Sequence, residues 1–303
     1  MNGCIIPSQA MNIANKISEV LVMKKFLKAT AIVLVIAMIA CFAACGGDKT
    51  NNDADANANS APESIKIGVQ TNTTGDIYSS SDFGEDAVVR YDNGALAVEA
   101  LKGGKVDIVI IDNEPAKSYV AANTGLKILE TEYAVEDYAI CFQKGDEDLK
   151  KAVDDALKAL IDDGSVKAII DKYINGTGEE LVGVSVEAVD TDKPNLVMAT
   201  NAEFPPYEYI DGDMYYGIDV EVAKIIADEL GYDLVIENVA FDSIIPGVQA
   251  GKYDMGMAGM TVNDERLLSV DFSSSYATGI QAVIVKEDGP IQTLEDLDPY
   301  YAS

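Results

Sequence analysis

A threonine and an arginine near the C-terminal end of the chain have the spacing of an anion clamp. Thr261 follows residues 253–259, an apolar run with the character of a buried strand. The polar stretch 263–265 favours a helix start, which places Arg266 in the first helical turn. A cation opposes the helix dipole there, but helix N–H groups, a hydroxyl and a guanidinium fork together suit a carboxylate. The alternative is an exposed arginine paired with one of its acidic neighbours.

An acidic residue in the first half of the chain has the complementary charge. Residues 106–112 (VDIVIID) form a nearly continuous apolar run that ends in Asp112. Such runs are typical of strands buried on both faces of a parallel sheet. Residues 71–76 form a hydroxyl-rich turn that contains Thr73 and Thr74 and leads into an expected helix. The alternatives are a strand-end cap for Asp112 and a plain turn residue for Thr73.

The composition excludes several classes of chemistry. The 303 residues include no His, which removes the Ser-His-Asp triad, the Cys-His dyad and any zinc site that needs imidazole. The formal charge of −29 argues against binding to nucleic acid and to anionic lipid. Hydrophobic residues make up 48% of the chain, and its length suits about two domains. We expect neither a metal nor a cofactor.

The first 44 residues have the pattern of a targeting segment. A basic start at Met23-Lys24-Lys25 precedes the apolar run 29–44, and Cys45 with two glycines follows. This end resembles a bacterial lipoprotein signal, so we expect cleavage before Cys45 and lipidation of that residue, palmitate included. The run is short for a membrane span. A retained transmembrane anchor is the alternative.

The expected mature chain is more acidic and has one internal cysteine. Loss of residues 1–44 removes four Lys and one Glu, which shifts the formal charge from −29 to −32. Only Cys141 then remains besides Cys45, so no intrachain disulfide is expected. Cys141 lies in an apolar run and is expected to be a small buried hydrophobe. Residues 45–63, rich in Asn, Asp and Ala, are expected to form a disordered tether.

Strand and helix patterns alternate from residue 65 onward, which predicts an α/β fold with two lobes. The first unit has expected strands at 65–70, 88–91, 106–112, 126–129 and 138–142, and expected helices from 76, at 93–102, 113–123, 147–162 and 165–174. A linker is expected at 175–195. The second unit has expected strands at 196–200, 234–239, 253–260 and 282–286, a hairpin at 207–216, and helices at 219–230, capped by Asp219, and at 241–250.

Four long motifs carry a family resemblance. They are TNAEFPPYEY (200–209), GIDVEVAKIIADELG (217–231), the run from FDSIIPGVQ to DFSSSY (241–276) and VIIDNEPA (109–116). Together they resemble the amino-acid-binding proteins of bacterial ABC importers, known as solute-binding protein family 3. The resemblance covers residues 65–297 and implies a type II periplasmic-binding-protein fold, a bilobed clamp that closes on a free amino acid.

The resemblance also implies a role for each matching residue. The guanidinium of Arg266 donates to both oxygens of the ligand α-carboxylate, with Thr261 beside it. The carbonyl of Gly259 accepts from the α-ammonium. From the other lobe, Thr73 and Thr74 add donors and Asp112 pairs with the ammonium. Phe204 and Phe241 sandwich the ligand, with plain core packing as the alternative. A zwitterion requires such opposite charges, both desolvated when the lobes close.

The side-chain specificity is expected to favour a neutral polar amino acid. Asn201 stands where many relatives that bind cationic amino acids carry an acid. Gln70 and Ile111 line the other lobe, and none of the three is charged. Asn72 replaces a glycine that is usual in its loop, and Asn tolerates positive φ better than most residues.

The two lobes come in the reverse of the order usual for the family. In the family, the unit with the arginine precedes the unit with the aspartate. We therefore expect either a circular permutant that folds as one monomeric clamp, or a fragment of a tandem fusion. The expected organisation is a signal peptide (1–44), a tether (45–63), lobe II (64–137), a crossover strand with the last helices of lobe I (138–174), a linker (175–195), lobe I (196–290) and a truncated interlobe segment (291–303).

The resulting prediction is an extracytoplasmic binding protein, lipid-anchored to the cell membrane, that serves an ABC permease and its ATPase subunits. It is not expected to be an enzyme. One alternative is a periplasmic dehydratase of the prephenate type on the same fold, for which Glu203 is the candidate acid. Another is the sensor domain of a receptor.

Overall fold

The computed structural model describes residues 63–129, 133–185 and 192–302. All of them lie in one compact unit, Ala56–Ser303. The expected signal peptide, Cys45 and nearly all of the tether lie outside the described residues. Within the described ranges, no helix is both long enough and apolar enough to span a membrane.

A six-stranded sheet contains Asp112. Its strands run in the order β2-β1-β3-β15-β4, and β5 pairs with β15 beside this path. β1 is parallel to β2 and β3, whereas β15 is antiparallel to β3, β4 and β5. The bounds are β1 Ile67–Gln70, β2 Val88–Tyr91, β3 Ile108–Asp112, β4 Leu126–Ile128, β5 Ala134–Tyr138 and β15 Ala277–Lys286.

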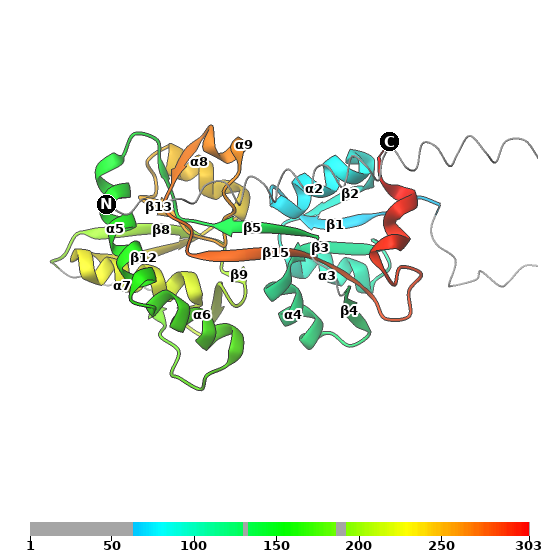
Figure 1. Cartoon of the computed structure of the whole chain (residues 1–303), viewed down its shortest axis with the longest axis horizontal. Coiled ribbons are helices and arrows are strands. Elements are labelled where there is room, and N and C mark those ends of the chain that lie inside the picture. Colours follow the sequence, from blue (N-terminus) through cyan, green and yellow to red (C-terminus); the bar gives the residue numbers. More distant parts are fainter. Residues whose placement is uncertain (1–62, 130–132, 186–191, 303) are drawn as a thin grey trace, which may run out of the picture. The chain divides into compact units, whose positions relative to one another are not determined.

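Helices cover both faces of this sheet, and α2 lies on the face opposite α3 and α4 (Figure 1). Alternate residues of β3 therefore pack in different cores: Ile108 and Ile110 in one, Val109 and Ile111 in the other. All five residues of β3 are buried, as the apolar run predicted. The bounds are α2 Thr74–Phe83, η2 Glu85–Ala87, α3 Gly94–Lys102, α4 Asn113–Ala122 and η4 Leu294–Tyr300. We call β1 to β4, with α2 to α4 and η4, the Asp112 side.

A five-stranded sheet carries the elements around Arg266. Its order is β12-β8-β13-β6-β14, in which β8 is parallel to β12 and β13, and β6 is antiparallel to β13 and β14. β6 precedes the expected linker in the chain and the other four strands follow it. The bounds are β6 Cys141–Gln143, β8 Asn195–Thr200, β12 Asp233–Asn238, β13 Met255–Gly256 and β14 Val270–Phe272.

Helices from both sides of the expected linker pack on this second sheet. α5 and α6 contact α7, and the buried Lys172 of α6 pairs with Glu221 of α7. The bounds are α5 Glu147–Asp162, α6 Ser165–Asn175, α7 Ile218–Leu230, η3 Phe241–Ser243, α8 Ile244–Gln249 and α9 Asp264–Leu267. A four-stranded sheet in the order β7-β11-β10-β9 adjoins α7 (β7 Val184–Ser185, β9 Glu203–Phe204, β10 Glu208–Asp211, β11 Met214–Tyr216). We call the five-stranded sheet, these helices and the four-stranded sheet the Arg266 side.

Two antiparallel strands, β5 and β15, carry the chain between the two sides (Figure 1). Gly279 faces Glu136 in their register. The expected strand 138–142 is in fact split, because the chain leaves one sheet after β5 and enters the other at β6. The expected strand 282–286 begins earlier, at Ala277, and lies in the six-stranded sheet rather than with the rest of the expected lobe I.

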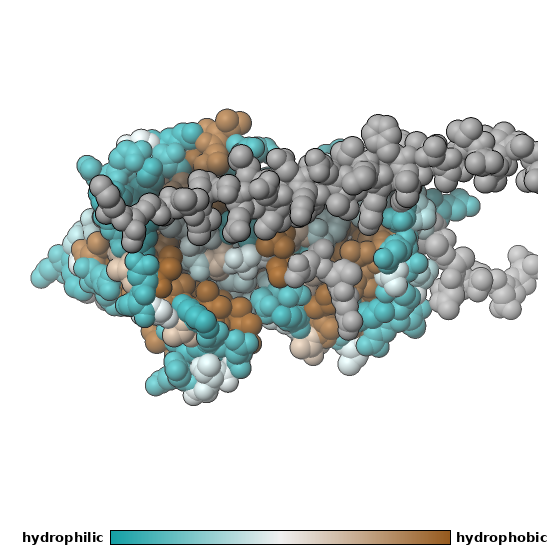
Figure 2. All heavy atoms as spheres, in the orientation of Figure 1, coloured by the Kyte–Doolittle hydropathy of each residue, from teal (hydrophilic) through white to brown (hydrophobic). Residues whose placement is uncertain are grey.

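Other local predictions differ from the structure in instructive ways. Asp219 does not cap α7, whose N-cap is Gly217; Asp219 is fully buried instead. The expected strand 253–260 is reduced to β13, and part of the expected linker forms β7. The expected helix 241–250 divides into η3 and α8. On the face in Figure 2, a hydrophobic patch lies over α9, where Leu267 and Leu268 are exposed.

Candidate functional site

All ten residues expected from the sequence to contact a ligand line one pocket. Its empty volume, which includes space open to solvent, is about 310 Å³, and it lies between the Asp112 side and the Arg266 side. The first side contributes Gln70, Thr73, Thr74 and Asp112; the second contributes Asn201, Phe204, Phe241, Gly259, Thr261 and Arg266. Glu208 and Ala258 complete the lining and were not predicted. Residues before and after the expected linker thus form a single cavity.

Arg266 is held by main-chain groups rather than by acids. Asn263 caps α9 and accepts from the Arg266 N–H at 2.8 Å. The guanidinium donates from Nη1 to the Thr261 carbonyl at 2.8 Å and from Nη2 to the Asn72 carbonyl at 3.1 Å. Its carbon lies 5.3 Å from the centre of the Phe241 ring, in cation–π contact. The side chain is 6% exposed, and no carboxylate of the described residues forms an ion pair with it, so the exposed, acid-paired alternative does not hold.

Asp112 ends β3 inside the pocket and is also buried. It occupies the N-cap position of α4 but makes no side-chain cap hydrogen bond, so the strand-end cap alternative does not describe it. It accepts instead from the Tyr138 hydroxyl. Burial raises the pKa of Asp112 to about 7, and the nearby Glu136 carboxylate adds to the rise. A cationic ligand group would stabilise the charged form.

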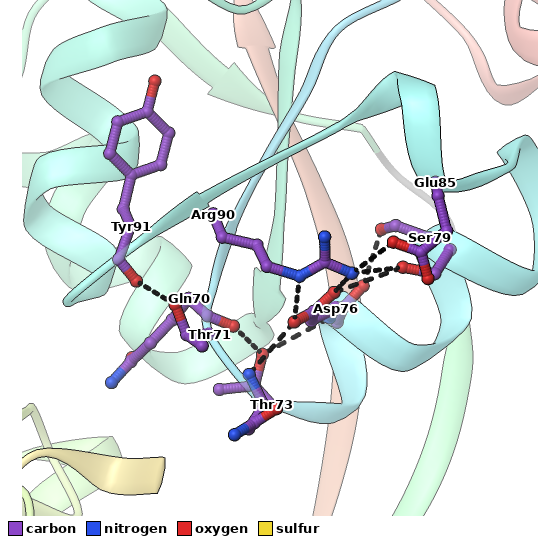
Figure 3. A network of polar contacts seen from close by, with 11 residues as sticks. Gln70, Thr71, Thr73, Asp76, Ser79, Glu85, Arg90 and Tyr91 are labelled. Atoms are coloured by element: carbon purple, nitrogen blue, oxygen red, sulfur yellow. Dashed lines mark hydrogen bonds and ion pairs between the residues drawn. The ribbon is translucent and has the colours of Figure 1, made fainter.

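A polar network surrounds the loop before α2 (Figure 3). Asn72 has a φ of 61°, and its N–H donates to Asp76 at 3.0 Å. Arg90 donates to the same carboxylate at 2.9 Å. The Thr73 hydroxyl donates to the Gln70 carbonyl at 2.8 Å and accepts from the Asp76 N–H at 3.4 Å. The Thr73 hydroxyl proton is therefore used in a hydrogen bond within the turn, as the alternative of a plain turn residue predicts.

The hydroxyls of Thr74 and Thr261 also have internal partners. Both donate to the same oxygen of Glu136, at 3.0 Å and 3.1 Å. Gln281 donates to that oxygen as well, at 3.1 Å. Burial lowers the pKa of Arg266, and Glu136 is the acid that most opposes this change. Glu136 was not among the residues singled out from the sequence.

Two uncharged side chains meet across the pocket. Gln70 Nε2 donates to Asn201 Oδ1 at 2.9 Å, and Asn201 Nδ2 donates to the Val239 carbonyl at 3.0 Å. Both residues are buried. They belong to opposite sides of the pocket, so their contact joins the two sides through groups that can also bond to a ligand.

Gly259 and Phe204 pack closely in the wall of the pocket. Gly259 has a φ of 51°, and a Cβ there would lie 2.8 Å from Cε1 of Phe204. Glycine therefore satisfies two demands at this position. Its N–H donates to Asp219 Oδ2 at 2.8 Å, which holds the turn that presents the Gly259 carbonyl.

Glu208 is the main pocket residue that sequence reasoning missed. It is fully buried, neither carboxylate oxygen accepts from an N–H group or a hydroxyl of the described residues, and the carboxyl group lies against that of Asp219. Burial, and next the neighbouring Asp219, raise the pKa of Glu208 well above its ordinary value. Burial also raises the pKa of Asp219 to about 7. The sequence carries no clear signal for this burial, because Glu208 and Ile210 share one face of β10, yet Glu208 is buried and Ile210 is 42% exposed.

One segment in the second part of the chain is similar to a known family. Residues 196–296 match the model of the bacterial extracellular solute-binding proteins, family 3. This segment includes six of the ten expected site residues and most of the Arg266 side. The predicted α/β, type II periplasmic-binding-protein fold agrees with the match.

The chain is also similar to curated proteins that are named as binding proteins. The arginine-binding extracellular protein ArtP of Bacillus subtilis is 37% identical over 115 residues, which cover 38% of this chain and 45% of ArtP. A probable histidine-binding protein of Neisseria gonorrhoeae is 32% identical over 101 residues, which cover 33% of this chain and 38% of that protein. This chain therefore spans less than half the length of either relative.

Solved structures give the same kind of similarity. An ancestral arginine-binding protein bound to arginine is 40% identical over a match that covers 26% of this chain and 35% of that protein's chain, with a TM-score of 0.26.

Within the described residues, no group of three or more His, Cys, Asp or Glu side chains is placed to hold a metal ion.

Proposed function

We propose that the chain captures a free amino acid in this pocket and delivers it to an ABC permease with its ATPase subunits. The observation that carries the proposal is the presence of a buried guanidinium and a buried carboxyl group, from opposite sides, in one cavity. Arg266 matches the ligand carboxylate and Asp112 matches the ligand ammonium. Both charges are costly to bury alone, and a zwitterion compensates both at once.

The lining favours a ligand with a neutral polar side chain. Gln70 and Asn201 are uncharged, and each offers both donor and acceptor groups. Such amides would recognise an amide or hydroxyl group of the ligand. This selectivity departs from the names of ArtP and the Neisseria relative, which are arginine- and histidine-binding.

A cationic amino acid is the second candidate ligand, and Glu208 favours it. A buried carboxyl group whose oxygens have no partner in the described structure would accept donors from a guanidinium or ammonium. Its raised pKa means that it accepts a cation only by losing a proton. Binding of a cationic side chain at Glu208 should therefore release a proton that binding of a neutral side chain does not release, and this difference distinguishes the two ligand classes.

We also propose that the chain is a permuted, monomeric clamp, lipid-anchored through Cys45 on the extracytoplasmic face. Two features support the permutation: β6 shares a sheet with strands that follow it by more than fifty residues, and α5 and α6 pack on α7. A fragment of a tandem fusion would instead need partner segments to complete its site. The sensor-domain reading has no observation in its favour.

The dehydratase alternative has less support. Its candidate acid, Glu203, is exposed and does not line the pocket; its carbonyl accepts from the Tyr119 hydroxyl at 2.9 Å. A keto-acid substrate also lacks an ammonium for Asp112. Binding without turnover therefore suits the arrangement better.

A thermal-shift screen of the purified chain tests the proposal. One arm contains glutamine, asparagine, serine and threonine, and the other arginine, lysine and histidine. A ligand at about 100 times its dissociation constant adds about 2.7 kcal/mol to the free energy of unfolding. Calorimetry with light scattering should then give one ligand per monomer. No shift with any amino acid would contradict the proposed function, and a lobe-exchanged dimer would contradict the monomeric clamp.

A further inference from the structure

Two buried carboxyl groups meet at the wall of the pocket. Glu208 lies on β10 and Asp219 in the first turn of α7, and both are fully buried. Glu208 lines the pocket, and its carboxyl group lies against that of Asp219. Two carboxylates in contact repel each other, and burial makes both charges costly, so one of the two groups keeps a proton. We call these two groups the carboxyl pair.

The main chain sets the place where the carboxyl pair meets. The Asp219 N–H donates to the carbonyl of Tyr207, the residue directly before Glu208, at 3.0 Å. This approach needs glycine at position 217, because a Cβ on Gly217 would lie 2.0 Å from the Tyr207 carbonyl oxygen. Gly217 also has a φ of 132°. The contact between the two carboxyl groups therefore follows from the path of the backbone between β10 and α7.

The hydrogen-bond partners of the carboxyl pair decide which member holds the proton. Asp219 Oδ2 accepts from the Gly259 N–H at 2.8 Å, and the Tyr276 hydroxyl also lies at this carboxyl group. The Glu208 oxygens accept from no N–H group or hydroxyl of the described residues. Hydrogen-bond donors stabilise the charged form of a carboxyl group, so Asp219 is the better carboxylate and Glu208 the better acid. Glu208 can then donate its proton to Asp219.

The other ionisable groups around the carboxyl pair do not replace this proton. Asp112 of β3 is an acid, and its charge raises the pKa of Glu208 further. Tyr119, Tyr207 and Tyr276 are the neighbouring tyrosines, and burial raises the pKa of each, so all three are neutral near pH 7. None of these neighbours carries a positive charge. The repulsion within the carboxyl pair is therefore relieved by a proton.

We propose that Glu208 is a positioning residue of the site: its proton is donated to Asp219, which holds the Gly259 N–H, and this fixes the Gly259 carbonyl that accepts from the ligand ammonium. The inference rests on the proposed function. It assigns Glu208 a neutral form in the liganded protein. This differs from the role of Glu208 as the charged partner of a cationic ligand side chain, and the two roles predict different results.

Two substitutions at Glu208 separate a proton donor from a charged partner. Glu208→Gln keeps an N–H donor for Asp219, whereas Glu208→Met has a similar length and no donor. Affinities of the full chain are measured by calorimetry at pH 7 with L-glutamine and L-arginine in separate titrations. Glu208→Gln should bind each of them within about threefold of the wild type, and Glu208→Met should lose about tenfold or more, because a hydrogen bond to a charged group is strong.

A matched control and the pattern of losses decide between the two roles. Glu229→Met makes the same change at an exposed position of α7 and should bind like the wild type. Equal affinities in Glu208→Met and the wild type would overturn the inference. A loss in Glu208→Gln that is as large as in Glu208→Met, and confined to arginine, would identify Glu208 as the charged partner of a cationic side chain and would also overturn it.

The proton itself gives a signature that a purely structural role would not give. In carbon NMR of the chain labelled at its glutamate carboxyl groups, one signal should stay at the position of a protonated acid at pH 7. This signal should be absent from Glu208→Gln and should persist when the wild type is saturated with either amino acid. Its loss on addition of L-arginine, or its absence from the free wild type, would contradict the assignment.

Failure of the proposed function gives a different result. If the wild-type chain binds neither amino acid, hydrogen exchange of the Gly259 amide is measured without ligand. Exchange about tenfold faster in Glu208→Met, with Glu208→Gln near the wild-type rate, would support the role of the carboxyl pair. Equal rates in all three proteins would overturn it.

Discussion

Gln70 and Asn201 are 131 positions apart in the chain, yet the amide of one donates to the amide of the other at 2.9 Å. Both line the pocket, one from each side. Their contact places a neutral pair where a ligand side chain would meet the protein. The selectivity of the site therefore depends on whether this pair stays uncharged.

An acid in place of the amide should change that selectivity. In Asn201→Asp, the new carboxylate can still accept from Gln70 and adds a negative charge to the pocket. We expect affinity for arginine relative to glutamine to rise by about one to two decades, because hydrogen bonds between charged groups are worth about 1.5–3 kcal/mol. Competition calorimetry measures the ratio, with Asn195→Asp, at an exposed strand end, as the control. An unchanged ratio would place the ligand side chain elsewhere.

Binding should release a proton near neutral pH. The pKa of Asp112 is raised to about 7, so part of the population is protonated at that pH, whereas an ammonium ligand selects the carboxylate. Affinity should therefore rise with pH by up to about tenfold per unit below pH 7 and level off above it. Calorimetry in buffers of different ionisation enthalpy detects the proton. Glu208 and Asp219 also have raised pKa values, so Asp112→Asn is the control. The same pH slope in that variant would remove Asp112 from the explanation.

The buried acids should make the fold more stable in mild acid. The pKa of Glu208 lies well above its ordinary value, so between about pH 4 and its folded pKa the native state holds a proton that the unfolded state has lost. The free energy of unfolding therefore falls as pH rises, by at most about 1.4 kcal/mol per unit for each such group. Glu208→Gln should flatten the decline in urea unfolding between pH 5 and 8. An equal slope in both proteins would contradict the burial of an ionisable Glu208.

Gly279 of β15 should not tolerate the methyl group of an alanine. A Cβ at Gly279 would overlap the Tyr138 ring, which also donates to Asp112. We expect Gly279→Ala to lower the free energy of unfolding by about 1–3 kcal/mol through overpacking. It should also weaken ligand binding by moving Tyr138. Thr278→Ala, exposed on the same strand, should leave both quantities nearly unchanged. Wild-type stability in Gly279→Ala would show that Tyr138 can move freely.

Patterns with a clear period were sufficient to predict most elements. The run that became β3, the helix pair α5 and α6, and the capped turn before α2 appear close to their expected bounds. Hydrophobic periodicity reports burial on a local face, and these elements have simple faces. Cys141 was likewise expected to be buried, and it is fully buried in β6.

Residues at the meeting of the two sides were harder to predict. Glu136 stands between Val135 and Asp137, and Glu208 stands between two tyrosines; an acid in such a strand usually faces water. Here each is buried, because partners far along the chain surround it: Thr261 beside Glu136, and Asp219 beside Glu208. The split of one expected strand into β5 and β6 has the same origin, since only the position of the second sheet decides where the first strand ends.

The loss of affinity in Arg266→Ala tests the central claim, that two distant segments form one amino-acid site. The measurement is calorimetry with the amino acid that gives the largest thermal shift, and Lys224→Ala, on an outer face of α7, is the control. Removing one partner of a buried charged contact costs about 2–5 kcal/mol, so we predict that Arg266→Ala loses about two to four decades in affinity. The wild type should bind one ligand per monomer. A loss of less than about threefold would contradict the account.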